Sequence, residues 1–262
     1  DNPGTTADSI PLICIPGTCR APYAFTNSIP VTDSRSRQVR QLKIKDNACS
    51  LMLWDPNLSL TLTENQNTSL SLETLCLACE AYFSQKASFF SDMFCEKSFE
   101  LLSYGMDEKK SLDITTPQEI LLAQGGCMAS LSVSTSSPGI ASLLALAINA
   151  RYKINRSLAA TILFPYVIEE VAKFKADKIE KIARLYGTAD EKLSRDEAVQ
   201  SFTENIRQKI AKANLPVRLK ELNLTMEQLA TCAEDAGQLD IMTMLPRSMT
   251  TDELFELMKQ AY

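Results

Sequence analysis

The sequence contains no histidine among its 262 residues. Histidine is the commonest metal ligand in proteins and the side chain that most often transfers protons near neutral pH. Its absence excludes any metal site or acid–base catalyst that this chain would build from imidazole groups. This absence constrains the function more strongly than any residue that is present.

The sequence also lacks long apolar runs and clusters of positive charge. Its longest apolar stretches, residues 139–150 and 158–168, are shorter than the roughly 20 residues that a membrane-spanning helix needs. Residues 1–9 are polar and lack the pattern of a signal peptide. The net charge is −5, and the basic residues are dispersed among acidic ones. We therefore expect a cytoplasmic protein with no membrane span and no nucleic-acid partner.

The composition supports a folded core, because 45% of the residues are hydrophobic. Eight cysteines lie mostly within apolar runs, where free thiols behave as small hydrophobic side chains. We therefore expect reduced cysteines that pack in the core rather than disulfides.

A helical pattern begins near Leu70, from where apolar residues recur at intervals of three and four. Residues 177–180 open another amphipathic stretch, which Gly187 can close in the left-handed conformation. Capping-box sequences predict four further helix starts, at Thr116, Ser194, Thr225 and Thr250. In the Thr116 box, Pro117 is expected to be the first helical residue.

Two short apolar runs near the N-terminus, residues 11–15 and 50–54, are bounded by Pro, Asp and Asn and predict strands. We expect a small sheet or hairpin there. The predicted fold is mainly α, with a strand and loop segment over residues 1–69 that leads into an all-helical domain over residues 70–262.

Four segments resemble a known family. Residues 15–33 begin I-P-G-T and end V-T-D, as the family stretch I-P-T-T-A-G-T-G-S-E ends in I-T-D. Residues 73–82 resemble the family helix D-A-L-x-H-A-x-E-A-Y. Residues 139–150 and 156–165 resemble G-x-x-H-A-x-A-H and H-G-x-A-N-A-x-L-L-P. The chain is thus similar, from about residue 11 onward, to the all-helical C-terminal domain of iron-containing alcohol dehydrogenases, which have a dehydroquinate synthase-like fold.

The resemblance implies an NAD(P)-dependent alcohol dehydrogenase with iron or zinc held by one Asp and three His. Glu73 matches the Asp, and Leu77, Ser142 and Arg156 match the three His. Leucine has no lone pair, serine is a weak neutral donor, and arginine carries a permanent positive charge. Leu146 matches a further histidine near the reacting groups. We therefore expect these positions to be vestigial, with no metal and no catalytic residues.

The resemblance also locates a cofactor-binding turn, which is degenerate here. The family sequence G-T-G-S-E is replaced by Arg20, Ala21, Pro22, Tyr23 and Ala24. Side chains displace the backbone amides that would approach a pyrophosphate, and proline has no amide hydrogen. The nucleotide-binding half of family members is also missing from this sequence. We therefore expect no bound cofactor.

We hypothesise that Arg156 fills the former metal space and pairs with Glu73, a guanidinium replacing a cation beside a carboxylate. The alternative is that Arg156 lies on a surface turn. Cys76 and Cys79 are expected to pack in the core, although the spacing of Glu73, Cys76 and Glu80 would also allow a relocated metal site on one helical face.

The functional expectation is a catalytically inactive family member that acts as a structural or protein-interaction module. Two alternatives remain open. The first is a fragment or subunit of an NAD(P)-dependent alcohol oxidoreductase, and the second is a small-molecule binding protein that uses the emptied cleft. The resemblance implies a homodimer or another protein partner.

Overall fold

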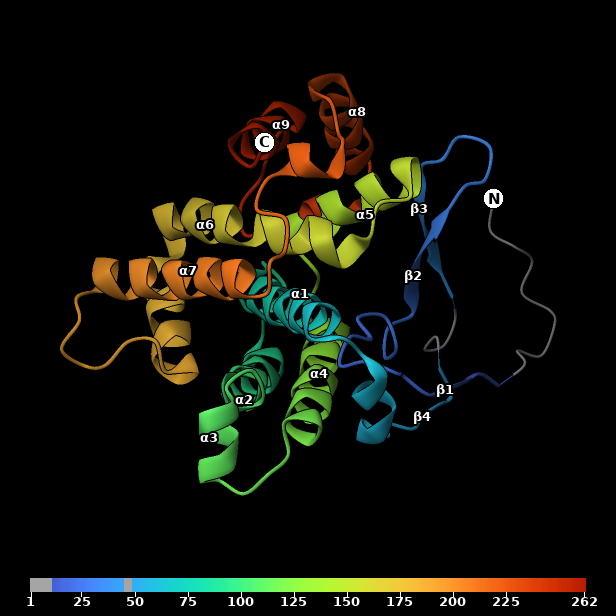
Figure 1. Cartoon of the computed structure of the whole chain (residues 1–262). Coiled ribbons are helices and arrows are strands. Elements are labelled where there is room, and N and C mark those ends of the chain that lie inside the picture. The colour runs from blue at the N-terminus through green and yellow to red at the C-terminus, as the bar shows by residue number, and fades with distance from the viewer. Residues whose placement is uncertain (1–10, 45–48) are drawn as a thin grey trace.

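The computed structural model describes residues 11–44 and 49–262. The N-terminal segment contains two separate two-stranded sheets (Figure 1). Strands β1 (Ile13–Cys14) and β4 (Leu51–Met52) pair in parallel, and β2 (Ser28–Thr32) pairs antiparallel with β3 (Val39–Lys43). The two predicted strands are thus confirmed as β1 and β4. The β2–β3 hairpin was not predicted, because Pro30 interrupts the first of its two runs.

The rest of the chain is helical, which confirms the predicted fold class. The α-helices are α1 (Glu64–Phe83), α2 (Phe89–Gly105), α3 (Glu108–Asp113), α4 (Gln118–Thr135), α5 (Ile140–Tyr152), α6 (Arg156–Tyr186), α7 (Arg195–Lys212), α8 (Met226–Gly237) and α9 (Thr251–Gln260). Short 3₁₀ helices are η1 (Pro56–Thr61), η2 (Leu219–Leu222) and η3 (Asp240–Met244). The predicted boundary after residue 69 falls inside α1, and the division into two domains stays a prediction.

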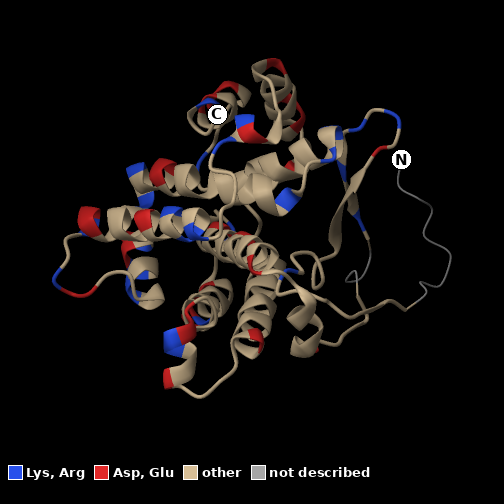
Figure 2. Ribbon diagram, viewed as in Figure 1, with Lys and Arg blue, Asp and Glu red and all other residues tan. Residues whose placement is uncertain are grey.

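Helix α1 forms the centre of the molecule and packs against α2, α4 and α6 (Figure 1). Charged residues are concentrated on the outer helices, whereas α1 and α5 carry few of them (Figure 2). Almost every residue of α1 from Ser69 to Phe83 is buried, including two glutamates. The helix that carries Glu73 and Leu77, the first two matched ligand positions, therefore runs through the core.

Glycines allow α2 and α4 to approach closely. A Cβ atom on Gly105 would lie 2.9 Å from side-chain carbons of Leu122, and one on Gly125 would lie 2.9 Å from those of Leu102. The hydroxyl of Ser98 donates to the carbonyl of Gly125 across this contact, at 2.9 Å. The pair is thus held by close backbone packing as well as by apolar burial.

Three predicted capping boxes are confirmed, at Ser194, Thr225 and Thr250. The fourth prediction was wrong by one residue. Pro117 has an extended backbone (φ −56°, ψ 142°) and is itself the N-cap of α4, without a capping side chain. The hydroxyl of Thr116 instead donates to the carbonyl of Ile114 at 3.2 Å.

The stretch predicted from residue 177 is the second half of α6 rather than a separate helix. A break at Lys175 (φ −135°, ψ 38°) bends α6 there, and Gly187 ends it in the left-handed conformation as predicted (φ 81°). The ammonium groups of Lys175 and Lys178 donate to the last carbonyls of α1, which have no partner within their own helix. The break therefore ties α6 to the end of α1.

Among the described helices, none alone has the length and apolar character needed to cross a bilayer. Only α4 and α5 taken together reach that criterion, and they meet at an angle of 96°.

Candidate functional site

Two carboxylates are buried in α1, Glu73 with 6% and Glu80 with 2% of the residue exposed. They are seven residues apart and so lie on one face of the helix. Buried carboxylates are rare and require partners, because removing a charge from water is costly. The partners of Glu73 are side chains, whereas those of Glu80 are backbone amides.

Glu73 is bound by two arginines and a hydroxyl group. Its Oε1 lies 2.5 Å from Nε of Arg20 and 3.2 Å from Nε of Arg156, and the Ser157 hydroxyl donates to its Oε2. Arg156 is the first residue of α6, and the side chain of Asn155 caps that helix. Three segments thus meet at Glu73: the turn that contains Arg20, the middle of α1, and the start of α6.

The predicted pairing of Arg156 with Glu73 is therefore confirmed. The surface-turn alternative was wrong, because only 19% of the Arg156 side chain is exposed. The contribution of Arg20 was missed, since this residue was considered only as part of the degenerate turn. The signal that could have found Arg20 is the burial of Glu73, because a buried carboxylate has two oxygen atoms that need partners and can pair with more than one guanidinium.

The turn around Tyr23 packs onto this ion-pair cluster. The guanidinium carbon of Arg156 lies 5.7 Å from the centre of the Tyr23 ring, within cation–π range. Desolvation raises the pKa of Tyr23 well above its usual value, although the charge of Arg20 opposes the shift. The amide of Ala24 donates to the carbonyl of Ala21 at 3.2 Å within the turn. That amide is therefore occupied internally, and the tyrosine stays neutral.

The same turn is fixed on its other side by α4. A Cβ atom on Gly126 would lie 1.8 Å from the carbonyl oxygen of Cys19, a distance that no side chain tolerates. Gly126 therefore permits the backbone of the turn to rest directly on α4. The position of Arg20 beside Glu73 follows from this close contact.

The other matched positions make no polar contact with Glu73 or Arg156. Leu77 and Leu146 are buried among apolar residues, with 4% and 6% exposed. Ser142 is half-buried in the first turn of α5, where its backbone amide donates to Glu80. Of the four matched ligand positions, only Glu73 and Arg156 are joined by a polar contact.

Glu80 caps the N-terminus of α5. Its carboxylate accepts hydrogen bonds from the backbone amides of Gly139 (3.0 Å), Ala141 (2.6 Å) and Ser142 (3.2 Å). A helix N-terminus favours such a negative charge. Desolvation nevertheless raises the pKa of Glu80, because burial outweighs the hydrogen bonds from Ser142 and the backbone. This contact was also missed in the sequence, because nothing local connects Glu80 to a helix that begins 60 residues later.

The relocated metal site is not assembled. Glu73 faces Arg20 and Arg156, whereas Glu80 faces the start of α5. Cys76 is buried in the core as predicted, and desolvation raises its pKa well above the usual value, so it is a neutral thiol. Within residues 11–44 and 49–262, no group of three His, Cys, Asp or Glu side chains is placed to hold a metal ion.

Comparisons with known proteins agree with this architecture. Lactaldehyde reductase from Escherichia coli K12 is 23% identical over 259 residues, which are 98% of this chain and 67% of that protein. Long-chain-alcohol dehydrogenase 1 from Geobacillus thermodenitrificans is 24% identical over 186 residues, covering 70% of this chain and 47% of its own length. The chain thus spans about two thirds, or less, of the length of these relatives.

Solved structures show the same fold. A 1,3-propanediol oxidoreductase superimposes with a TM-score of 0.88 at 19% identity, over 98% of this chain and 68% of its own. An alcohol dehydrogenase from Oenococcus oeni gives the same TM-score at 18% identity and the same coverage. The family described as Fe-containing alcohol dehydrogenase, C-terminal, matches residues 68–262. The resemblance found in the sequence is therefore confirmed, and this chain belongs to the Fe-containing alcohol dehydrogenase family.

Proposed function

We propose that this chain is a non-catalytic member of its family, a pseudoenzyme in which an ion-pair cluster closes the metal position. The observation that carries the proposal is the contact between Arg156 and Glu73, at 3.2 Å. The guanidinium occupies one oxygen of the only carboxylate at the four matched positions. A second guanidinium, from Arg20, approaches the same oxygen at 2.5 Å.

The residues at these positions do not fit iron or zinc. A divalent metal ion requires ligand atoms at about 2 Å and usually three or more protein ligands. Glu73 and Ser142 are the only matched residues with a donor oxygen, and Ser142 lies against Glu80 instead. Two permanent positive charges beside Glu73 would also repel the cation. The loss of the ligands and the presence of the two arginines both weaken metal binding at this position.

Without a metal ion, an alcohol has no Lewis acid to stabilise its alkoxide form. Proton transfer lacks support as well, because Leu146 matches the further histidine that the family has near the reacting groups. The Tyr23 hydroxyl stays protonated as well, because burial raises its pKa. These features support inactivity rather than a changed mechanism.

The experiment compares the protein with a variant that restores the ligands, Glu73→Asp combined with Leu77→His, Ser142→His and Arg156→His. Both are purified from cells grown with added iron, and metal content is measured together with NAD(P)H oxidation by short aldehydes. We expect no stoichiometric metal and no turnover in the wild type, and more bound metal in the variant. Stoichiometric iron or zinc with turnover in the wild type would overturn the proposal in favour of an oxidoreductase subunit.

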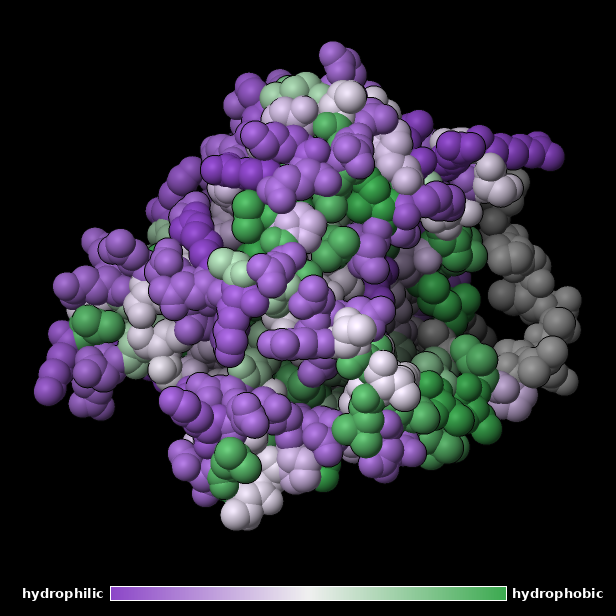
Figure 3. Space-filling model, in the orientation of Figure 1, coloured by the Kyte–Doolittle hydropathy of each residue, from purple (hydrophilic) through white to green (hydrophobic). Residues whose placement is uncertain are grey.

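A protein-binding role is supported by the apolar face of the N-terminal segment. More than half of the exposed large hydrophobic side chains in the described ranges lie within residues 12–60. Figure 3 shows an apolar area over β1, β4 and η1. Ile13 and Leu51, which face each other in the β1–β4 pair, are 57% and 48% exposed. We define residues 12–15, 51–53 and 58–60 as the β1–β4 face.

The pairing on this face indicates what covers it. Parallel strands occur almost only in sheets with helices over both surfaces, and a pair of two-residue strands is not stable in isolation. We infer that the partner is an α/β domain that extends this sheet with parallel strands. The matched relatives agree in length, because about one third of lactaldehyde reductase lies outside the part that aligns. This inference also accommodates a subunit that works with a separate domain.

The geometry does not favour a small molecule in the emptied metal space. Arg20, Arg156 and Tyr23 fill the space around Glu73. A ligand there would have to separate the ion pairs that join the turn, α1 and α6.

A further inference from the structure

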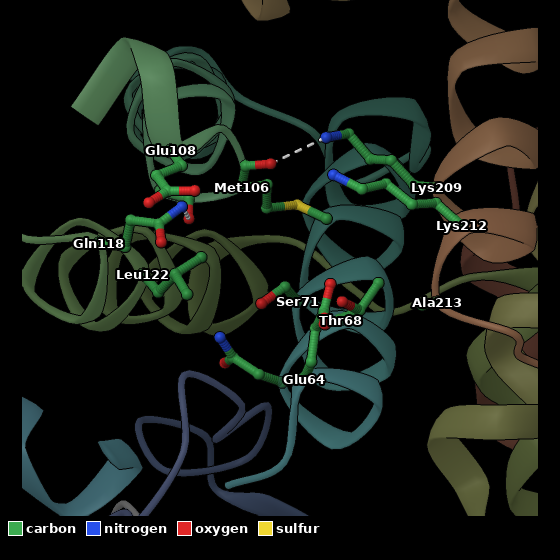
Figure 4. Close-up of a pocket in the computed structure, with 12 residues that line it drawn as sticks. Glu64, Thr68, Ser71, Met106, Glu108, Gln118, Leu122, Lys209, Lys212 and Ala213 are labelled. Atoms are coloured by element: carbon green, nitrogen blue, oxygen red, sulfur yellow. Dashed lines mark hydrogen bonds between the residues drawn. The ribbon is translucent and has the colours of Figure 1, made fainter. Parts of the chain in front are cut away.

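A polar cleft of about 400 Å³ lies between α1, α4, α7 and the connection from α2 to α3 (Figure 4). Its volume is in the range of small-molecule sites. The lining includes none of Glu73, Leu77, Ser142 or Arg156. The cleft, which we call the Lys209 cleft, is therefore separate from the family's metal position, and what it binds does not depend on the proposed loss of catalysis.

Two ammonium groups enter the cleft from the last turn of α7. Lys209 and Lys212 are three residues apart, and Figure 4 shows their side chains extending in parallel toward the same space. Lys209 is half-buried and donates one hydrogen bond, to the carbonyl of Met106 at 3.0 Å. Desolvation lowers the pKa of Lys209. The negative charge of Asp107 opposes this shift, whereas the positive charges of Lys110 and Lys212 lower the pKa further. The Lys209 ammonium group retains free donors, and although Asp107 is near enough to act on its charge, no described carboxylate forms an ion pair with it.

Hydroxyl and amide groups form the opposite part of the lining. Ser71 on α1 is 1% exposed, and its hydroxyl contacts only the sulfur of Cys19, at 3.8 Å. Sulfur is a weak hydrogen-bond partner, so this buried hydroxyl is poorly satisfied. One turn earlier, the Thr68 hydroxyl has no hydrogen bond to any described residue. Gln118 donates its amide to Gly105 at 3.2 Å and keeps its amide oxygen free as an acceptor.

Two carboxylates also line the cleft. Glu64 and Glu108 are both exposed, so water and salt screen their charges. They can accept hydrogen bonds from hydroxyl groups of a ligand. The ammonium and carboxylate groups are thus arranged for a ligand that carries both negative charge and hydroxyl groups.

We propose that the Lys209 cleft binds a small phosphorylated polyol. The phosphate dianion lies between Lys209 and Lys212, because two ammonium groups match its charge and lysine binds phosphate as a point charge. The polyol hydroxyls pair with Ser71, Thr68 and the free oxygen of Gln118. An uncharged polyol leaves the ammonium groups unpaired, and inorganic phosphate leaves the hydroxyl wall unpaired.

The test is isothermal titration calorimetry with glycerol 3-phosphate, inorganic phosphate and glycerol as separate probes. We expect glycerol 3-phosphate to bind more tightly than either of the other two. Lys209→Met and Lys212→Met are each expected to weaken its binding about tenfold, as for the loss of one charge-assisted hydrogen bond. Lys220→Met is the matched control, because Lys220 is exposed on η2, outside the cleft, and gives the same change in net charge.

Each remaining outcome contradicts the proposal. No binding of glycerol 3-phosphate at millimolar concentration, or equal affinity for inorganic phosphate, would leave an adventitious anion only. Equal weakening by Lys220→Met would show a general charge effect. If Lys209→Met melts early because its bond to Met106 is lost, the exposed Lys212 variant decides the result. None of these readouts depends on metal content or turnover.

Discussion

Nε of Arg156 lies 3.2 Å from Oε1 of Glu73, and by sequence resemblance these two residues match metal-ligand positions of the family. The contact joins the start of α6 to the middle of α1, and Arg20 adds the N-terminal turn to the same oxygen. The positively charged side chains of Arg20 and Arg156 thus join these segments through Glu73. A metal ion bound to Glu73 would also be positively charged. The following predictions test this contact and the features around it.

Replacement of Arg156 by alanine is expected to destabilise the fold. Glu73 would keep Arg20 and Ser157 but lose one buried partner, at a cost of about 1–3 kcal/mol in the free energy of unfolding. Urea denaturation measures the change. Arg195→Ala is the control, because Arg195 pairs with Glu180 at an exposed site and should cost at most about 1 kcal/mol. Equal small effects in both variants would show that the Arg156 pair contributes nothing.

Glu80 is expected to produce a pH dependence of stability with an unusual sign. Its pKa is raised in the folded state, so the folded protein binds more protons than the unfolded chain above the ordinary glutamate pKa of about 4.3. The contribution of Glu80 to stability therefore falls as the pH rises from that value through the raised pKa. Denaturation of wild type and Glu80→Gln at a series of pH values measures the difference.

Glu197 provides the opposite sign in the same protein. Hydrogen bonds from the Ser194 side chain and backbone lower its pKa, so its stabilising contribution is present above the ordinary value and is lost as the pH falls through the lowered one. Glu197→Gln should change the pH profile in the sense opposite to Glu80→Gln. Parallel profiles for the two variants would contradict the buried environment assigned to Glu80.

Gly126→Ala is expected to detach the N-terminal turn from α4. Alanine raises helix propensity by about 1 kcal/mol, but the collision with the Cys19 carbonyl costs about 1–3 kcal/mol or more. Thermal unfolding should therefore show a net loss of stability. Gly17→Ala is the matched control, because nothing lies within 4 Å of its added Cβ. A fully stable Gly126→Ala protein would mean that the turn does not rest on α4.

Ile13→Glu and Leu51→Glu are expected to reduce binding of an apolar fluorescent dye, because both residues lie at the centre of the β1–β4 face. Leu112→Glu changes an exposed leucine on α3, away from that face, and should have less effect. Sedimentation of the wild type then identifies the occupant. A stable dimer that these two variants dissociate would assign the face to a second copy instead of an α/β partner.

The sequence predicted those features that depend on local chemistry or on charge at matched positions. Ser194, Thr225 and Thr250 begin helices because each is followed three residues later by a side chain that completes the cap. The partner of Arg156 could be predicted because a buried guanidinium requires a carboxylate, and Glu73 occupied the matching position.

Features that depend on long-range packing could not be predicted. The parallel pairing of Ile13 with Leu51 joins residues 38 positions apart. The bond of Glu80 to Ala141 spans 61 positions. The Lys209 cleft combines four segments whose side chains show no common pattern along the chain. In each case the geometry arises only after the helices have packed.

The bonds from Gly139, Ala141 and Ser142 to Glu80 have a consequence for hydrogen exchange. The first amides of a helix normally exchange with solvent by fraying of its end. Here the acceptor is Glu80, which lies on a different helix, α1. Fraying of α5 therefore breaks these bonds only if it also leaves the buried carboxylate of Glu80 without its partners. We therefore expect these three amides to report the opening of α1 from α5 and to exchange as slowly as amides of the core.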